Sequence, residues 1–442
     1  MRPMNKRFYL RLWHWHFFAA LYVLPFILLL SLTGLVMLFG PWLDDWQFGE
    51  ELTQSQTIIA AEGMSAGVEK WQRVSPDKQR VEVQKTFPSL YTYQFIPPLS
   101  PEQTSIFKVR DANYVTQWVF VDPYTGKVQG HFANDDRWYS VAADLHRNMM
   151  LGKIGGGFIE IAVGLMLLLV ILGLSMALLK RPAFNKRLVI KSSKQRSFWL
   201  KLHIQLGLFC SLVILFYGLS GMTLTGTWGQ KLVKPYSSFP VEKYAYSWPS
   251  NLNEANKGAS WSLEQVMKQA KALGFSLEDG NRYRIALPLQ PTGVYTLMSI
   301  ASSRDVLSPA QDRTIHIDRY SGEVLADIGW EDYSFQAKTM AAIIPLHFST
   351  LGWWNLVIAI IVCLGLLLMA LTGTIMWYKR RRKSRRFSLS APIRVELKLA
   401  TLSFAEKALL VAYGLIALIF PLSALFIAVL FLLTRLTRRF FN

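Results

Sequence analysis

Long apolar stretches alternate with polar segments along the chain and predict membrane-spanning helices. A helix needs about 20 mainly apolar residues to cross the roughly 30 Å hydrocarbon core of a bilayer. Four stretches meet this length: residues 17–39, 157–179, 204–226 and 354–378. The first is too long for the apolar part of a signal peptide and has no small-residue cleavage site, so we expect it to be retained as a span.

A further apolar stretch near the end of the sequence, residues 405–434, is interrupted by Pro421. It is longer than one span and shorter than two comfortable ones. We therefore expect either one long helix or a tight hairpin around Pro421, which leaves the number of spans at five or six.

Basic residues gather in short segments beside the apolar stretches. The first 16 residues and the segment between the second and third spans carry lysine and arginine without any acid, and a basic run, residues 379–383, follows the fourth span. Such clusters mark the cytoplasmic side. We therefore expect a cytoplasmic N-terminus and two exported polar segments, about 40–145 and 227–344, which would face the periplasm of a bacterium. Membrane topology then accounts for the excess of basic residues that gives the formal net charge of +19. We therefore expect no nucleic-acid partner.

The two halves of the chain repeat the same pattern. In the first helix of each half, a histidine stands 18 residues before a glycine: His16 before Gly34, and His203 before Gly221. The second helices match from His146 to Gly173 and from His347 to Gly373. The polar segments share VFVDPYTGKV (119–128) and IHIDRYSGEV (315–324), each of which predicts a β-hairpin with Asp and Gly in its turn.

Because both halves begin on the same side, they are parallel repeats related by an axis along the membrane normal. The predicted fold is a mainly α membrane protein with a four-helix transmembrane core, a C-terminal hydrophobic helix or hairpin, and two small α+β periplasmic domains. In the second of these domains, residues 262–273 have helical apolar spacing and a start at Ser262–Glu264 compatible with capping. The predicted divisions are 1–40 (first transmembrane helix), 41–145 (first periplasmic domain), 146–180 (second helix), 181–200 (basic loop), 201–226 (third helix), 227–344 (second periplasmic domain), 345–379 (fourth helix), 380–404 (basic loop) and 405–442 (C-terminal helix or hairpin).

The repeat axis would bring the four equivalent histidines together as two pairs. His16 would meet His203 at the cytoplasmic face, and His146 would meet His347 at the periplasmic face. Paired neutral imidazoles in a helix bundle can hold a metal or a haem iron from two sides, and without a CxxCH motif any haem is non-covalent, hence b-type. The alternative is that each histidine anchors its helix at the membrane interface.

The remaining candidates have weaker patterns. Arg147, beside His146, could pair with a haem propionate or simply extend to the interface. His14 lacks a repeat counterpart and is expected at the interface, while His131 and His316 are expected on the surface. Two cysteines, Cys210 and Cys363, lie in apolar stretches and offer no disulfide framework.

Four motifs together resemble the PepSY-associated transmembrane (PepSY-TM) family, which includes iron-regulated inner-membrane proteins and ferric-siderophore reductases. They are WHFFAALYVLPFILLLSLTGLVMLFGPWLDDW, DLHRNMMLG, SFWLKLHIQLGLFCSLVILFYGLSGMTLTGTWG, and IPLHFSTLGWWN running on to GTIMWYKRR. The hairpins DPYTGKV and DRYSGEV look like PepSY motifs, and the resemblance extends to about residue 385. It implies b-type haem bound by transmembrane histidines, here His16, His203, His146 and His347 as the ligands, and electron transfer to periplasmic ferric chelates.

From these observations we expect a di-haem b reductase of the bacterial inner membrane that acts on a ferric siderophore or another Fe(III) chelate. No GxGxxG dinucleotide motif is present, so the electron donor would be a quinol or a separate cytoplasmic reductase. Two alternatives remain open. One is a non-enzymatic PepSY membrane protein that regulates a peptidase or binds a periplasmic ligand. The other is a ferric-chelate transporter, although the spans contain almost no carboxylates besides Glu160.

Overall fold

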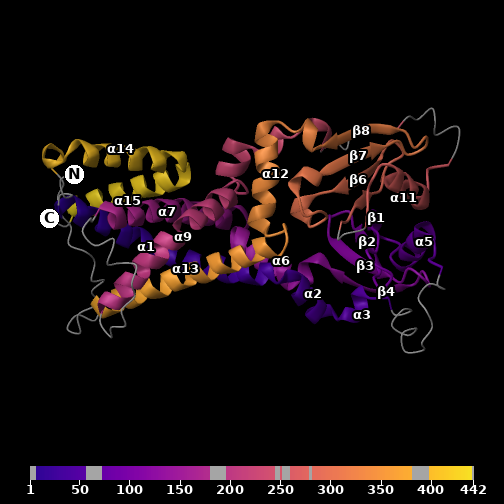
Figure 1. Ribbon diagram of the computed structural model, residues 1–442, viewed down its shortest axis with the longest axis horizontal. Coiled ribbons are helices and arrows are strands. Elements are labelled where there is room, and N and C mark those ends of the chain that lie inside the picture. The colour runs from indigo at the N-terminus through magenta and orange to yellow at the C-terminus, as the bar shows by residue number, and fades with distance from the viewer. Residues whose placement is uncertain are drawn as a thin grey trace. The chain divides into compact units, whose positions relative to one another are not determined.

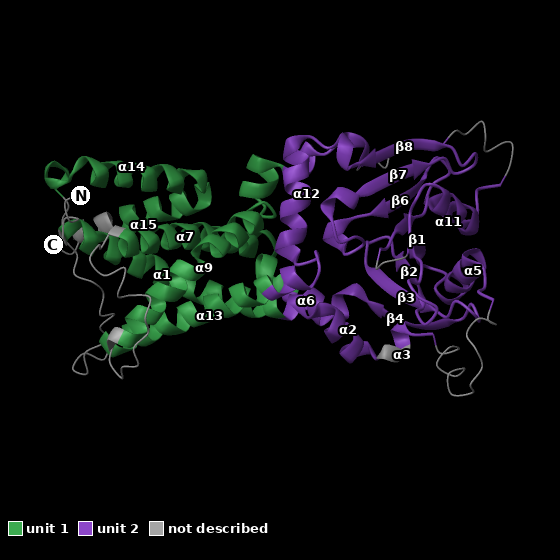
Figure 2. Ribbon diagram, in the orientation of Figure 1, with its two compact units in different colours: residues 1–35, 143–234, 358–442 green, residues 36–142, 235–357 purple. Residues whose placement is uncertain are grey.

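The computed structural model describes residues 6–55, 72–179, 196–243, 249–250, 259–277, 281–380 and 398–440. The chain folds into two compact units, coloured separately in Figure 2. The membrane unit comprises residues 1–35, 143–234 and 358–442, and the sheet unit comprises residues 36–142 and 235–357.

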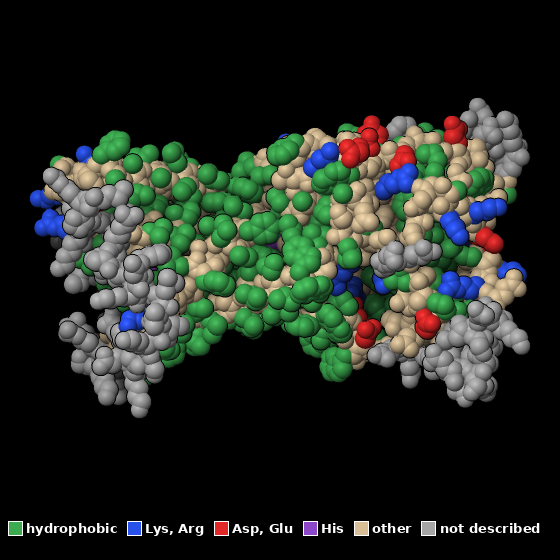
Figure 3. Space-filling model, viewed as in Figure 1, with side chains coloured by type: hydrophobic (Ala, Val, Ile, Leu, Met, Phe, Trp, Pro, Cys, Tyr) green, Lys and Arg blue, Asp and Glu red, His purple; other side chains and the backbone are tan. Residues whose placement is uncertain are grey.

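Four long apolar helices form where the sequence predicts spans. They are α1 (Lys6–Leu38), α7 (Gly152–Leu179), α9 (Arg196–Met222) and α13 (Trp353–Arg380), and each is long and apolar enough to cross a membrane. Most of them begin earlier than the apolar stretches because helical geometry continues through the polar residues at the interface. On the face drawn in Figure 3, hydrophobic side chains cover most of these helices. The chain is therefore a multi-pass membrane protein.

The fifth apolar stretch is broken at the predicted proline. Helix α14 (Phe404–Ile419) and helix α15 (Pro421–Phe440) meet at an angle of 116°. Proline has no backbone N–H to continue the first helix but fits the first turn of a new one. Helix α15 packs on α7, where Ser423 Oγ donates to the Ile161 carbonyl at 3.1 Å. The approach depends on Gly164, because a Cβ there would lie 2.2 Å from Ser423 Oγ.

The described residues of the sheet unit form an antiparallel sheet of eight strands in the order β4-β3-β2-β1-β5-β6-β7-β8. Its strands are β1 (Tyr91–Ile96), β2 (Ser105–Arg110), β3 (Thr116–Val121), β4 (Val128–Ala133), β5 (Arg284–Ala286), β6 (Tyr295–Ser299), β7 (Arg313–Ile317) and β8 (Val324–Gly329). The sequence predicts two small separate domains, whereas the two strand sets join through β1 and β5, with Phe95 opposite Ile285. The pairing satisfies the backbone groups of two edges that would otherwise be open.

Helices α5 (Pro76–Thr86) and α11 (Leu263–Ala272) lie beside the sheet (Figure 1) and pack on one of its faces. Alternate strand residues such as Phe107, Val119 and Leu297 point into this core, as the period of a strand requires. The predicted start of α11 is confirmed. Ser262 caps it, with Gln265 rather than Glu264 as its capping-box partner.

Both predicted hairpins are confirmed, as β3–β4 and β7–β8. In each turn an aspartate, Asp122 or Asp318, accepts hydrogen bonds from two following backbone N–H groups. Four residues later Gly126 or Gly322 has a φ of +73°, a conformation that glycine adopts without strain.

The other helices within the described residues are short. They are α2 (Gly40–Phe48), α3 (Glu50–Thr53), α6 (Trp138–Asn148), α12 (Phe335–Phe348), the 3-10 helices η2 (Asn134–Asp136), η4 (Pro235–Ser238), η5 (Val241–Lys243), η6 (Ala301–Ser303), η7 (Pro309–Gln311), η8 (Trp330–Asp332) and η9 (Leu399–Thr401), and the π-helix η3 (Trp228–Val233). Helix α6 carries His146 and helix α12 carries His347.

Candidate functional site

Two of the four repeat-equivalent histidines lie together inside the membrane unit. His16 on α1 and His203 on α9 are separated by 6.5 Å between ring centroids, and their planes are nearly perpendicular at 88°. Both rings are half-buried among the helices. The sequence prediction that these two residues meet is therefore confirmed, although their role as ligands stays a prediction.

The Nδ1 atom of each of these imidazoles has a hydrogen-bond partner on another helix. His16 Nδ1 lies 3.2 Å from the Leu169 carbonyl of α7, an acceptor only, so Nδ1 carries the proton. His203 Nδ1 lies 2.9 Å from Thr372 Oγ1 of α13. The Thr372 hydroxyl donates its own proton to the Met369 carbonyl at 3.0 Å, so its oxygen accepts from the imidazole. In both residues the protonated Nδ1 leaves Nε2 with a lone pair, and within the described residues no hydrogen bond occupies it.

His146 has the same arrangement on helix α6. Its Nδ1 lies 2.9 Å from Thr33 Oγ1 of α1, and the Thr33 hydroxyl donates to the Leu29 carbonyl at 2.7 Å. The imidazole of His146 is thereby held as the Nδ1–H form, with Nε2 again unengaged among the described residues. Metal-ligating histidines characteristically donate their second N–H to an oxygen in this way.

A glycine of the repeat lies at the edge of each of these rings. A Cβ on Gly173 would lie 3.2 Å from His16 Cε1, one on Gly373 would lie 3.7 Å from His203 Cε1, and one on Gly34 would lie 3.8 Å from His146 Cε1. A larger residue would fill the space beside the imidazole. The glycines that the repeat analysis singled out therefore keep one edge of each ring clear.

His347 lies near the end of α12 and belongs to the sheet unit, whereas His146 belongs to the membrane unit. The pairing of these two histidines stays a prediction. Both are followed by left-handed backbone at non-glycine residues: Met149 and Met150 have φ of 55° and 57°, and Ser349 has φ of 56°. Such residues cost of order 1–3 kcal/mol each and tend to cluster at functional sites.

The other histidines have different surroundings. His316 is almost fully buried in β7, so the prediction of a surface position is wrong. Its Nδ1 lies 2.9 Å from Thr296 Oγ1, its Nε2 donates to the Glu242 carbonyl at 2.9 Å, and burial lowers its pKa. His131 is exposed in β4, as predicted, and its ring contacts Phe87. His14 is half-buried, with its ring 4.8 Å from that of Phe18.

Arg147 is exposed and pairs with a residue of its own helix. Its side chain is 70% exposed, and one guanidinium nitrogen lies 2.5 Å from Asp144 Oδ1. This pair occupies one of the donors that a haem propionate would use. A role for Arg147 toward haem stays a prediction.

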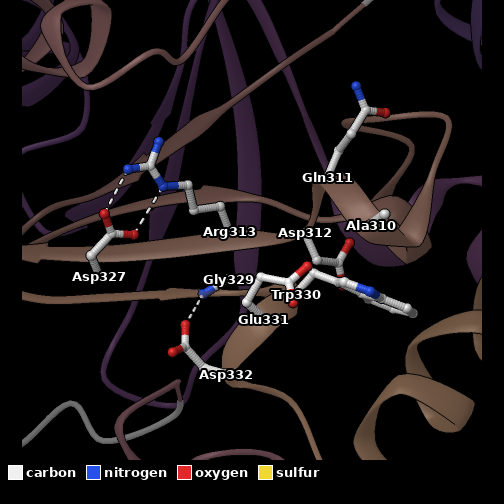
Figure 4. Close-up of a pocket in the computed structure, with 9 residues that line it drawn as sticks. All are labelled: Ala310, Gln311, Asp312, Arg313, Asp327, Gly329, Trp330, Glu331 and Asp332. Carbon is white, nitrogen blue, oxygen red and sulfur yellow. Dashed lines mark hydrogen bonds and ion pairs between the residues drawn. The ribbon is translucent and has the colours of Figure 1, made fainter.

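A separate pocket of about 440 Å³ lies in the sheet unit and contains several carboxylates (Figure 4). Asp327 pairs with Arg313 at 2.6 Å, Asp332 accepts from the Gly329 backbone, and buried Asp312 lies 3.7 Å from Lys243 Nζ. These carboxylates are occupied by contacts within the fold. Across the described ranges, no group of three or more His, Cys, Asp or Glu side chains could hold a metal ion.

The two threonines that orient His146 and His203 were not among the residues predicted from the sequence. Each immediately precedes a repeat glycine, as Thr33–Gly34 and Thr372–Gly373. The sequence motifs that contain these glycines therefore also contain the hydroxyl that accepts the imidazole hydrogen bond.

The fold and these sites define a multi-pass membrane protein in which helices of the bundle hold oriented histidines. The chain belongs to the family described as the PepSY-associated TM region, whose model matches residues 13–380. Among curated proteins, none matches the chain significantly.

Proposed function

We propose that this protein is a di-haem b reductase that carries electrons across the bacterial inner membrane to a ferric siderophore or another Fe(III) chelate. The observation that supports it most strongly is the common state of His16, His146 and His203. Each donates Nδ1–H to an oxygen of another helix, and in the part of the chain that the structure describes no hydrogen bond engages its Nε2, which is the state that a haem iron requires of its ligand.

The spacing of the first pair fits an iron between two imidazoles. Metal–imidazole nitrogen bonds are about 2.0 Å long, so two rings on opposite sides of one iron have centroids roughly 6 Å apart. The observed separation of His16 and His203 is 6.5 Å. The absence of side chains at Gly173 and Gly373 gives room beside these rings.

Haem held at these imidazoles supplies a one-electron carrier. His16 and His203 would hold one of these groups, and His146 and His347 the other. Thr33, Thr372 and the Leu169 carbonyl fix the orientation of three of the rings. One electron from a quinol or a cytoplasmic reductase converts Fe(III) in the chelate to Fe(II), which hard oxygen ligands bind less tightly, and the iron is released.

The proposed direction follows from the lysine and arginine clusters. They favour a cytoplasmic N-terminus and an exported sheet unit. His16 and His203 would then lie toward the cytoplasmic donor, and His146 and His347 toward the periplasmic acceptor.

Haem stoichiometry tests the proposal directly. We expect two non-covalent haems per chain in a pyridine-haemochrome assay, and loss of one haem when either member of a pair is replaced, in His16→Ala, His203→Ala, His146→Ala and His347→Ala. His131→Ala is the matched control because His131 is exposed, and it should retain both haems. Purified protein without a Soret band would refute the haem proposal and favour a non-enzymatic PepSY protein. Import of an intact labelled chelate would instead favour a transporter.

A further inference from the structure

A cluster of basic side chains lies on the sheet face opposite α5 and α11. Lys108 lies in β2 between Phe107 and Val109, both of which point into the core under the helices. By strand alternation Lys108 points to the other face, where its cross-strand neighbours are Gln94 and Trp118. Arg284 in β5 occupies the same face, since its neighbour Ile285 lies in the helix-covered core.

Two cations share one aromatic ring in this cluster. Lys108 Nζ lies 4.0 Å from the centre of the Trp118 ring, and the Arg137 guanidinium lies 4.9 Å from the same ring. The indole face attracts each cation, but it cannot neutralise two positive charges. Among the described residues, no hydrogen bond or ion pair engages the Lys108 ammonium group.

The nearby carboxylates neutralise only some of these positive charges. Arg137 forms a two-pronged ion pair with Asp44, and Arg284 donates to both carboxylate oxygens of Asp305 at 2.9 and 3.1 Å. Each carboxylate therefore has an arginine partner already. Lys108 and Arg304 are left as the two cations of the cluster without a carboxylate of their own.

Arg304 lies within electrostatic range of Arg137 and has an unusual backbone conformation. It follows η6 with φ of +61°, a left-handed geometry that costs a non-glycine residue about 1 kcal/mol or more. The side chain is half-buried, lies within electrostatic range of Arg137, Asp44 and Tyr139, and has no hydrogen bond or ion pair within the described residues. A half-buried cation with strained backbone, close enough to another cation to be repelled by it, is consistent with a site for an external anion.

We propose that Lys108, Arg137, Arg284 and Arg304, termed here the basic cluster, bind the anionic groups of a negatively charged metal chelate. The identity of the ligand as a ferric chelate rests on the proposed function, whereas the anion site rests on the sheet unit alone. Planar guanidinium groups and a lysine ammonium suit carboxylate or catecholate oxygens. The basic cluster would therefore select anionic chelates over cationic ones.

Protonation of Lys108 gives the site a characteristic pH dependence. Burial, together with repulsion from Arg284 and Arg137 and against the attraction of Asp305, lowers the pKa of Lys108 to about 7. A bound anion favours the charged ammonium and raises this pKa again. Affinity should therefore be highest below pH 7 and should fall as the pH rises through 7, where the free protein loses the Lys108 proton.

Binding of Ga(III)–citrate to the purified full-length protein tests this proposal without electron transfer, because Ga(III) is not reduced. We expect Lys108→Gln and Arg304→Gln each to weaken binding roughly tenfold, the loss of one charge-assisted contact. Lys108→Arg should restore the affinity and abolish the decrease between pH 6 and 8. Lys268→Gln is the matched control, because Lys268 is exposed on α11 over the opposite face, and its affinity should equal that of the wild type.

Three results would overturn the anion site: unchanged affinity in Lys108→Gln, equal binding of a cationic Ga(III)–trihydroxamate, or loss of haem in Lys108→Gln, which would assign the cluster to haem carboxylates.

The anion site and the reductase proposal can be refuted independently of each other. Protein without haem that still binds Ga(III)–citrate through Lys108 would retain the anion site and refute the reductase. Protein that binds two haems, but whose affinity for Ga(III)–citrate does not depend on Lys108, would retain the reductase proposal and refute the anion site.

Discussion

Thr372 controls His203 through a single hydrogen bond whose direction is fixed by a second one. Because its hydroxyl donates to Met369, its oxygen accepts Nδ1–H of His203. In Thr372→Val the imidazole loses this acceptor, and we expect haem affinity at the His16/His203 site to fall about 10- to 100-fold. The measurement is titration of haem-depleted protein followed in the Soret region.

Thr374→Val is the matched control for this variant. Thr374 lies two residues further along α13, and its hydroxyl donates to the Ala370 carbonyl at 2.8 Å without any imidazole contact within the described residues. The same polar-to-apolar change should leave haem affinity unaltered. Equal losses in both variants would show that α13 responds to any such substitution and that Thr372 does not orient His203.

Gly173 is the tightest of the glycine–imidazole contacts. A Cβ there would lie 3.2 Å from His16 Cε1, so in Gly173→Ala the ring must shift by a few tenths of an ångström, and a larger side chain would displace it. We expect reduced haem content in Gly173→Ala and loss of one haem in Gly173→Leu. Gly414→Ala should retain both haems, because a Cβ at Gly414 has no atom within 4 Å. Full haem occupancy in Gly173→Leu would contradict this role.

The two hairpins of the sheet differ in how tightly their turn glycines are packed. Gly126 and Gly322 share φ of +73°, so alanine at either position costs roughly 1 kcal/mol in backbone strain. At Gly322 a Cβ would also lie 1.8 Å from the Trp261 ring, whereas at Gly126 the nearest atom is Val74 Cγ1 at 3.2 Å. We expect Gly322→Ala to lower the melting temperature of the sheet unit more than Gly126→Ala does, as measured by thermal unfolding. Equal shifts would mean that Trp261 moves away at no cost.

Local patterns predicted the elements of this fold well. The four spans, the break at Pro421 and both hairpins follow from apolar length, proline chemistry and the Asp and Gly positions of the turns, all of which depend on neighbouring residues. The pairing of β1 with β5 was not predicted. It joins Phe95 to Ile285 across 190 positions of the chain, and no local pattern specifies which of two open strand edges will meet.

Some contacts of the candidate site were also predicted from the sequence, whereas contacts between residues on distant elements were not. The predicted repeat placed His16 beside His203, and their ring centroids do lie 6.5 Å apart. The burial of His316 was missed, since its partners Thr296 and Glu242 lie on other elements. The basic cluster was also missed, although the alternation of Phe107, Lys108 and Val109 could have indicated a strand with a charged position on a half-covered sheet.

At the scale of the whole molecule, the charge pattern and the histidines lead to one functional requirement. If the basic segments mark the cytoplasmic side, each proposed histidine pair serves a different face of the membrane. Electron transfer across the bilayer then needs both pairs, whereas binding of an anionic chelate needs only the sheet unit. The two activities can be separated by mutation.

Proteoliposomes with dithionite trapped inside and Fe(III)–citrate outside test this requirement. We expect the wild-type protein to produce external Fe(II), measured with an impermeant Fe(II) indicator, because electrons can cross only through the protein. His16→Ala and His347→Ala should each reduce the rate to that of empty vesicles, since each removes a proposed ligand from a different face. His131→Ala should retain the wild-type rate. In Lys108→Gln the rate should be lower at limiting chelate and should return to the wild-type value at saturating chelate, because the substitution weakens docking and leaves the histidines intact. A wild-type rate in His347→Ala would show that this histidine does not serve the route to the acceptor, and the pairing of His146 with His347 would have to be abandoned.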